Sequence, residues 1–528
     1  NYKLRVDGVL IADGDPANHI TFTSNQATPA PGDWNQVLFY GPDGGTVLNY
    51  CDISYGGSSE GGVCHRSGGS LSITNCTIMH SATSGVYAWT ASPTVSDCTI
   101  SDNVGHGIQC LDTTSDPMVT DCTIQDNGGW AVVTFGGNVK DYTGAMTITG
   151  NNPDAILVGA DNTVTGTWPN HGVPYVINGN QSVGNGATLT IEPGCEVRFN
   201  GNYELRVDGV LIAAGDPSNR ITFTSNQPTP APGDWNQLYF VGPDAGTVLD
   251  YCDISYGGSS FGAVYHRSGG SLAITNSTIM HSGTAGAYLQ DASPTLSSCT
   301  VEQNTVAGIH YLGTAAPTLS GCTLQSNQFG VRGEGGICHF ADTNEIINNT
   351  SYGFYLTGAC TATFGDTLTE WNDIYGNGTY DFYNGTNDIY AYYVYWGTTD
   401  PSVISSHIWD DFDDTALGVV YFSHWLDDTH ENEQSLTTPV ITSISAAAAD
   451  TVHIAWNPVP GALSYRVNSS VMPWASYTMD GTGTFADTTW SAPLNGDIRF
   501  YRVNAVAGSE VSAPSNIVGY EQYVADIP

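Results

Sequence analysis

Short segments of alternating apolar and polar residues follow one another along most of the chain. Leu71-Ser-Ile73 and Cys76-Thr-Ile78 are two of them, and Asn, Asp, Gly or Ser residues lie between the segments. Alternation with a period of two predicts strands that bury one face. No apolar stripe at helical spacing accompanies it, and Gly, Thr, Ser and Asn are frequent throughout, so the pattern excludes a helical fold.

The segments recur with a period of about 22 to 25 residues. The phrase Cys-Thr-Ile, for example, returns at Cys76, Cys98 and Cys122. A strand this short cannot bury its apolar side alone, but coils stacked about 4.8 Å apart give every backbone group a partner. We therefore predict an all-β fold, a parallel β-solenoid with three short strands per coil. A β-propeller, the rival architecture, needs about 40 residues and four strands per blade, which these units cannot supply.

The chain also contains a long internal duplication. The sequence NYKLRVDGVLIADGDPANHITFTSNQ from Asn1 returns as NYELRVDGVLIAAGDPSNRITFTSNQ from Asn202. Roughly four positions in five match over residues 1–84, which identifies an internal repeat. We predict that residues 1–201 and 202–395 are two successive copies of the solenoid.

The repeated phrases ITFTSNQ, PAPGDW, CDISYGGSS and ITNCTI support a family resemblance. On these phrases, residues 1–430 resemble large secreted bacterial surface proteins with a right-handed parallel β-helix of the pectate-lyase-like superfold. The resemblance implies the fold, together with a bacterial, extracellular or cell-surface location. It implies no single activity, because this superfold includes lyases, hydrolases, esterases, adhesins and inert rods.

The repeat pattern ends in the last quarter of the chain. After Thr379 the sequence becomes aromatic, and HIWDDFDDTALGVVYFSHWLDD is similar to phrases that close many proteins of that bacterial group. We predict a C-terminal cap and linker over residues 396–437. From Thr438 the chain resembles a fibronectin type III domain, on Trp456, Tyr465 and the strand that contains Tyr501. This second resemblance implies a β-sandwich over residues 438–528 that spaces or docks rather than catalyses.

The charge balance excludes several classes of partner. The 528 residues include 12 Lys and Arg against 51 Asp and Glu, which gives a formal net charge of −39. Neutralising phosphates needs clustered cations, so nucleic acid is excluded, and anionic lipid surfaces and polyuronates are disfavoured. No apolar run approaches the roughly 20 residues of a membrane span. Because the chain begins at Asn1 rather than Met, we expect a mature secreted product whose leader has been removed.

The sharpest catalytic candidate is the tripeptide Gly105-His-Gly107. It resembles the Gly-His-Gly of polygalacturonase-like β-helix hydrolases, which also need clustered aspartates and a basic residue that grips the uronate. Neither a matching Asp pair nor a basic segment accompanies it, and the second copy has Ala307 at the position of His106. We therefore interpret His106 as a histidine of a surface turn and predict no catalytic residue.

A His-Arg dipeptide survives the duplication, at His65-Arg66 and His266-Arg267. A paired histidine and arginine can bind a carboxylate or lie at an interface, and we predict such a binding or interface role. The alternative is that each arginine neutralises nearby acidic turns in a chain that has few cations.

Four aspartates lie close together in the predicted cap, at Asp410, Asp411, Asp413 and Asp414. Carboxylate oxygens are the ligands that Ca²⁺ prefers, and we predict a calcium site there as the one cofactor. The run lacks the spacing of a dedicated calcium loop. The alternative is therefore a solvated acidic face.

Aromatic residues are unusually dense where the repeat ends. We predict a binding or interface role for four of them, Tyr390, Tyr392, Tyr393 and Trp396. Aromatic rings stack on sugars and are enriched at protein interfaces. The alternative is that the rings close the solenoid core over its last coil.

Seven cysteines recur at one phase of successive coils, at positions 51, 76, 98, 122, 252, 299 and 322. We predict an inward-facing stack, whose parallel side chains favour buried free thiols over disulfides. Disulfides between neighbouring coils remain the alternative.

These observations favour a non-enzymatic extracellular structural protein that acts by its shape in a fibre, a surface layer or an adhesive. The chain starts within a repeat, so its first coil presents an uncovered edge, and we expect head-to-tail self-association through it. The runner-up is a carbohydrate-active β-helix enzyme or a glycan-binding protein. It predicts paired carboxylates on neighbouring coils, beside aromatic rings.

Overall fold

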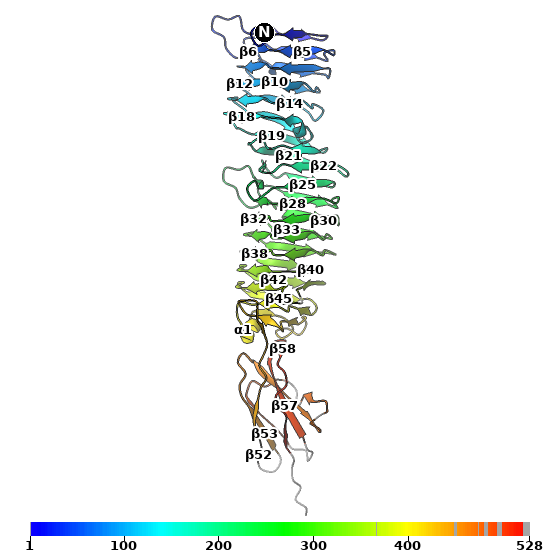
Figure 1. Cartoon of the computed structure of the whole chain (residues 1–528), viewed down its shortest axis with the longest axis vertical. Helices are drawn as coiled ribbons and strands as arrows, with labels where there is room; N and C mark the ends of the chain where they lie inside the picture. Colours follow the sequence, from blue (N-terminus) through cyan, green and yellow to red (C-terminus); the bar gives the residue numbers. More distant parts are fainter. Residues whose placement is uncertain are drawn as a thin grey trace, which may run out of the picture. The chain divides into compact units, whose positions relative to one another are not determined.

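The computed structural model describes residues 2–365, 367–447, 451–473, 475–479, 484–493 and 499–520. The chain divides into two compact units, Asn1–Val306 and Ala307–Pro528. Figure 1 shows strands of unit 1 stacked in the order of the sequence, with β5 and β6 near one end and β33 toward the other. The prediction of an all-β parallel solenoid is confirmed. No helix among the described residues is long and apolar enough to cross a membrane.

The first part of unit 1 has three parallel sheets, and each coil adds one strand to each sheet. The first sheet contains β1 (Leu4–Val6), β4 (Val37–Tyr40), β7 (Gly61–Arg66), β10 (Ser84–Trp89), β13 (Ile108–Cys110), β16 (Val132–Phe135) and β19 (Ile156–Asp161). The second contains β2 (Ile11–Asp13), β5 (Thr46–Asn49), β8 (Leu71–Thr74), β11 (Thr94–Ser96), β14 (Met118–Thr120) and β17 (Tyr142–Thr143). The third contains β3 (Ile20–Phe22), β6 (Cys51–Ser54), β9 (Thr77–Met79), β12 (Thr99–Ser101), β15 (Thr123–Gln125) and β18 (Thr147–Thr149).

Single polar residues make the corners between the second and third sheets. Asn75, Asp97 and Asp121 have φ values of 53°, 52° and 53°, in the left-handed region. Asn and Asp tolerate that region better than other residues with side chains. The polar punctuation of the sequence is therefore the set of corners at which the chain turns from one sheet to the next.

Like side chains stack inside the coils. Ile53, Ile78, Ile100 and Ile124 occupy one inward position of the third sheet in successive coils, and all four are buried. Burying apolar surface contributes about 25 cal/mol per Å², and each coil needs its neighbours to complete that burial.

The two side sheets are interrupted within residues 136–168, near the end of the first copy. The second and third sheets end at β17 and β18, and a 3₁₀ turn, Gly136–Asp141, lies beside β20 (Gly166–Trp168), which begins a new sheet. The first sheet continues through the long strand β21 (Tyr175–Val183). Its first three residues pair with β23 and its last three with β24. The junction therefore interrupts two faces of the solenoid and leaves one continuous.

Unit 1 then repeats the three-strand coil. The remaining strands are β22 (Thr188–Ile191), β23 (Glu196–Phe199), β24 (Glu204–Val207), β25 (Val210–Ala214), β26 (Ile221–Ser225), β27 (Gln237–Val241), β28 (Val248–Asp250), β29 (Cys252–Ser255), β30 (Gly262–Arg267), β31 (Ala273–Thr275), β32 (Thr278–Met280), β33 (Ala285–Gln290), β34 (Thr295–Ser297) and β35 (Thr300–Glu302).

Unit 2 begins with solenoid coils and a cap. Its coil strands are β36 (Ala307–Leu312), β37 (Thr318–Ser320), β38 (Thr323–Gln325), β39 (Phe329–Gly333), β40 (Gly336–Phe340), β41 (Asn344–Ile347), β42 (Tyr352–Thr357), β43 (Cys360–Thr363), β44 (Asn372–Tyr375) and β45 (Tyr380–Gly385). The cap elements are β46 (Ile389–Tyr390), β47 (Val394–Tyr395), α1 (Pro401–Ser406), β48 (Ile408–Trp409), β49 (Val420–Tyr421), β50 (Trp425–Leu426) and β51 (Glu433–Gln434).

Two antiparallel sheets follow the cap. One contains β52 (Ile441–Ala447), β53 (Thr451–Trp456) and β56 (Thr489–Pro493). The other contains β54 (Ser464–Ser470), β55 (Thr478–Met479), β57 (Arg499–Ala507), β58 (Glu510–Val511) and β59 (Val518–Tyr520). One hydrophobic cluster joins them, with Trp456 from the first sheet and Tyr465 and Tyr501 from the second. The last eight residues of the domain predicted over 438–528 lie outside the described residues.

Candidate functional site

His65 and His266 lie inside the solenoid. Both side chains are fully buried. Their Nε2 atoms lie 2.8 Å and 2.6 Å from the carbonyl oxygens of Gly68 and Gly269, so each Nε2–H donates to the turn after its strand. Burial lowers the pKa of both rings, that of His266 to about 4. The two histidines are therefore neutral core residues.

Arg66 and Arg267 come next in the sequence and face the outer side of the same strands, because alternate residues of a strand face opposite sides. Arg66 forms an ion pair with Glu60, and its guanidinium carbon lies 4.5 Å from the centre of the Trp89 ring. Each histidine and its following arginine thus face opposite sides of the strand, so they form no joint site. The predicted binding or interface role stays a prediction for Arg66 and Arg267. The alternative, that the arginine neutralises a nearby acidic group, is confirmed for Arg66.

The aspartate run of the cap forms a turn. Asp410 is buried, and its carboxylate accepts hydrogen bonds from the backbone N–H groups of Phe412, at 3.0 Å, and Val420, at 2.8 Å. Burial raises the pKa of Asp410. Asp413 accepts from the N–H group of Asp410, and Asp414 accepts from that of Ala416.

This turn does not gather its carboxylates into a ligand set. The described part of the chain holds no group of three or more His, Cys, Asp or Glu side chains placed to hold a metal ion. Calcium binding by Asp410, Asp411, Asp413 and Asp414 stays a prediction, and the geometry gives it no support.

The aromatic residues of the cap divide between the core and the surface. Trp396 is buried and lies edge-on to Phe422, as expected of a ring that closes the core. The ring of Tyr390 is exposed and stacks on Tyr421 at a centroid distance of 4.9 Å. Tyr392 and Tyr393 are half-buried and lie against His424. The predicted interface role stays a prediction for the three tyrosines. The side chain of Trp396 is too deeply buried to contact a partner.

The histidine of the Gly-His-Gly tripeptide forms a hydrogen bond with the backbone of the next coil. Nδ1 of His106 accepts a hydrogen bond from the N–H group of Trp130, 3.0 Å away on the next coil, and burial lowers the pKa of the ring. His106 is a half-buried turn histidine, close to the surface-turn role predicted for it.

The cysteines form the predicted inward stack. The backbone N–H groups of Cys51 and Cys76 each lie 3.4 Å from the Sγ atom one coil further on, in Cys76 and Cys98. In the second copy, Ser277 replaces a cysteine and accepts from the N–H group of Cys252 at 3.0 Å. All twelve cysteines are buried free thiols, as the parallel side chains predict.

Asparagine ladders are a feature that the sequence analysis missed. In unit 1, Nδ2 of Asn103 donates to Oδ1 of Asn127, and Nδ2 of Asn127 donates to Oδ1 of Asn151, both at 2.8 Å. The ladder ends on Asp154. The sequence carried a signal, because Asn103 and Asn127 each stand five residues after a cysteine of the stack.

A second ladder runs through the coils of unit 2. Nδ2 of Asn327 donates to Asn349 at 3.2 Å, and that of Asn349 donates to Asn377 at 2.9 Å. It ends on the buried carboxylate of Asp381, whose pKa is raised by burial. Each ladder satisfies polar groups that would be costly to bury alone.

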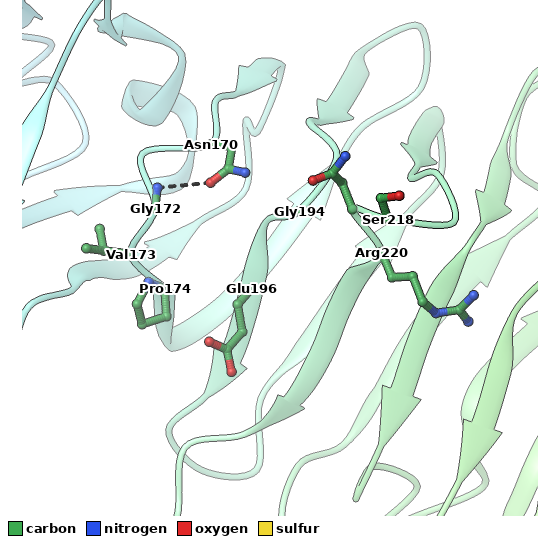
Figure 2. A pocket seen from close by; sticks show the side chains of 9 residues that line it. Asn170, Gly172, Val173, Pro174, Gly194, Glu196, Ser218 and Arg220 are labelled. Carbon is green, nitrogen blue, oxygen red and sulfur yellow. Dashed lines mark hydrogen bonds between the residues drawn. The ribbon is translucent and has the colours of Figure 1, made fainter.

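A polar cleft opens at the junction of the two copies, where the side sheets are interrupted (Figure 2). Its volume is about 390 Å³, and Asn170, Glu196, Ser218 and Arg220 line it among others. Figure 2 shows the guanidinium of Arg220 directed away from Glu196. It is held instead by Asp253, at 2.8 Å, and by backbone carbonyls. The charged groups of this cleft are thus largely engaged within the fold.

A second cleft of about 380 Å³ shares the wall residue Asn170 and includes Lys140. Lys140 forms ion pairs with Asp116, at 3.5 Å, and with Asp141. Burial and the neighbouring carboxylate of Asp141 raise the pKa of Asp116. This cluster joins two carboxylates from neighbouring coils to the one lysine near them.

The coils and junction described above correspond to a known family. Residues 7–179 and 262–391, more than half of the chain, match the family described as "Right handed beta helix region". The chain belongs to this family. The match to the right-handed β-helix covers coils of both units and includes Asp116 and Lys140 of the second cleft. It ends before the antiparallel sheets at the C-terminus.

No curated protein matches this β-helix protein. Among solved structures, 19 chains match it. The Dettilon tailspike protein is 12% identical over 79% of this chain and 87% of its own, with a TM-score of 0.26. An Fn3-like protein from Clostridium thermocellum is 22% identical over 17% of this chain and 97% of its own, with a TM-score of 0.14. A human fibronectin type III domain is 18% identical over 18% of this chain and 77% of its own, with a TM-score of 0.15.

Proposed function

We propose that this β-helix protein is a non-enzymatic structural protein, secreted by a bacterium, that acts by its shape outside the cell or on its surface. The proposal rests on one observation, which is that the chemically active side chains named above form hydrogen bonds within the fold. The histidines of the core, the cysteine stack, the asparagine ladders and Asp410 all hold one coil to the next or close a turn. A fold whose buried polar groups have hydrogen-bond partners in this way keeps a fixed shape.

Two finer features belong to the proposal. Residues 1–201 and 202–395 are duplicated copies, which is supported by equivalent bonds such as those from the indoles of Trp34 and Trp235 to Ser54 and Ser255, both 2.8 Å. Residues 438–520 are a fibronectin type III module, supported by two antiparallel sheets around one core. The module serves as a spacer or a docking domain.

Head-to-tail association is the assembly that we propose. Leu4 of the first coil is 39% exposed, whereas the equivalent Leu205 is 2% exposed because β21 covers it. In the second copy a parallel strand covers the equivalent apolar residue, which supports parallel stacking as the form of contact between copies. A contact of this kind between copies is heterologous and builds filaments.

Fusing a second copy of residues 175–201 ahead of the first coil tests this assembly. The fused coil is expected to cover the edge within the same chain, so the variant stays monomeric while the parent protein forms end-to-end oligomers as its concentration rises. Sedimentation velocity and electron microscopy measure the difference. Parent protein that stays monodisperse and monomeric at high concentration, with and without Ca²⁺, would contradict the assembly.

A carbohydrate-active enzyme is the second candidate, and the cluster of Asp116, Lys140 and Asp141 favours it. A carboxyl whose pKa is raised beside a second carboxylate can act as a general acid. The structural proposal predicts no release of reducing sugars from a panel of neutral and charged polysaccharides. Release that falls at least a hundredfold in Asp116→Asn, with an unchanged melting temperature, would establish the enzyme instead.

A further inference from the structure

Three tyrosines form a column on the outer side of the first sheet in unit 1. Tyr239, Tyr265 and Tyr288 are register partners on β27, β30 and β33. The rings of Tyr239 and Tyr265 stack at a centroid distance of 4.8 Å, and Tyr265 meets Tyr288 edge-on at 5.3 Å. Phe261 lies 4.9 Å from Tyr265 and 5.2 Å from Tyr288, and it is 44% exposed. We call these four residues the aromatic platform.

One ion pair, side-chain amides and the charged residues Glu204 and Arg267 surround the aromatic platform. Arg206 forms an ion pair with Asp208 at 2.8 Å, and its guanidinium carbon lies 5.6 Å from the centre of the Tyr239 ring. The carboxylate of Glu204 accepts from the side-chain amide of Gln237 at 3.1 Å, and Gln290 accepts from the hydroxyl of Tyr265 at 2.7 Å. In a chain of net charge −39, this surface combines aromatic rings, amides and a neutralised arginine. Such a surface suits an uncharged ligand with many hydroxyl groups.

The first copy shows that the fold does not need three of these four rings, although it keeps Tyr87 at the position of Tyr288. At the positions of Tyr239, Phe261 and Tyr265 it has Leu38, Glu60 and Cys64. The same two strands form there with the same register, Leu38 opposite Cys64.

Four residues around these positions are the same in both copies. Arg206, Asp208, Gln237 and Arg267 correspond to Arg5, Asp7, Gln36 and Arg66. Glu204 and Gln290, by contrast, correspond to Lys3 and Trp89. Substitution has thus changed the rings and part of the polar border, which is the pattern expected when two related sites differ in specificity.

We propose that the aromatic platform binds an uncharged polysaccharide, whose sugar rings stack on Phe261 and Tyr288 while their hydroxyl groups bond to Glu204 and Gln290. The corresponding surface of the first copy does not bind it, because Glu60 replaces Phe261 and because Lys3 and Trp89 replace the two hydroxyl-binding residues. The inference rests on the proposed function as a surface protein, since it supplies the attachment to a glycan matrix. A protein partner is the competing occupant of such a surface.

The first copy supplies the test variant. Replacing Tyr239→Leu, Phe261→Glu and Tyr265→Cys gives the second copy the residues that the same scaffold already carries. Affinity electrophoresis of the full chain in gels that contain hydroxyethylcellulose, xyloglucan, galactomannan or polygalacturonate measures binding. We expect at least one neutral polymer to retard the parent protein, and the triple variant to bind at least about tenfold more weakly. Phe412→Leu, which alters an exposed ring of the cap, should bind as the parent does.

Three results would overturn the inference. They are an absence of retardation by every neutral polymer, equal binding by the triple variant, and concentration-dependent dimers of the parent that the triple variant loses. The last would assign the aromatic platform to a protein contact. End-to-end assembly of the triple variant, seen by electron microscopy, reports separately on the proposed function, because the substitutions lie far in sequence from strands β1 to β3.

Discussion

Replacing Asn127 with alanine is expected to lower the free energy of unfolding by about 3–6 kcal/mol. The side chain is 1% exposed. Its Nδ2 donates to Asn151 at 2.8 Å and to the carbonyl of Ile100 at 3.1 Å, and its Oδ1 accepts from Nδ2 of Asn103 at 2.8 Å. Alanine removes these three bonds and a fourth, from the backbone N–H group of Asn103 to Oδ1 at 3.2 Å, and leaves buried partners unsatisfied, each at a cost of about 1–3 kcal/mol.

Urea unfolding followed by circular dichroism measures this effect. Asn178→Ala is the matched control, because that exposed side chain only accepts a bond of 3.2 Å from Asn200. Its expected change is within about 0.5 kcal/mol. A loss below about 1 kcal/mol in Asn127→Ala would show that the ladder contributes little to stability.

Replacing His266 with glutamine is expected to make the protein less sensitive to acid. The folded chain keeps the pKa of His266 near 4, below the ordinary value of 6.5, so the unfolded chain takes up the proton first. The contribution of the neutral His266 ring to the free energy of unfolding is therefore fully present above pH 6.5, and it is lost as the pH falls from 6.5 to about 4. That fall in pKa corresponds to about 3 kcal/mol.

The difference between parent and variant carries the test. Glutamine cannot be protonated but still offers an N–H group to the carbonyl of Gly269. The His266→Gln variant should therefore be less stable than the parent at pH 7.5, and this difference should shrink or reverse at pH 4.5. Thermal unfolding at both values measures it. Phe240→Leu, at the ring packed edge-on against His266, should destabilise equally at the two pH values. A destabilisation by His266→Gln that is the same at both would refute the buried neutral histidine.

Much of the solenoid followed from local patterns. Alternation, as in Leu71-Ser-Ile73, predicts a strand wherever it occurs, and Asn75 or Asp97 predicts the corner because few other residues adopt a left-handed backbone. The same alternation could have placed His65, which stands two residues after the buried Val63 and so shares its inward face. The same alternation places the next residue, Arg66, on the opposite face of the strand.

The candidate sites were less accessible to prediction. Lys140 meets Asp116 only because one coil returns above another 24 residues later. The polar clefts exist because the side sheets stop at β17 and β18, and no local pattern marks where a sheet stops. The contact between Phe261 and Tyr288 likewise depends on the register of two coils.

The sequence by itself determined the repeating strand, the corner and the β-helix family, because each depends on residues within one coil or on the repetition of that coil. The tertiary structure decided which face each side chain occupies and which coil it meets. Stacking sets both, since a coil completes its hydrogen bonds and its core only against its neighbours. The aromatic platform and the polar clefts are therefore surfaces formed by residues of different coils.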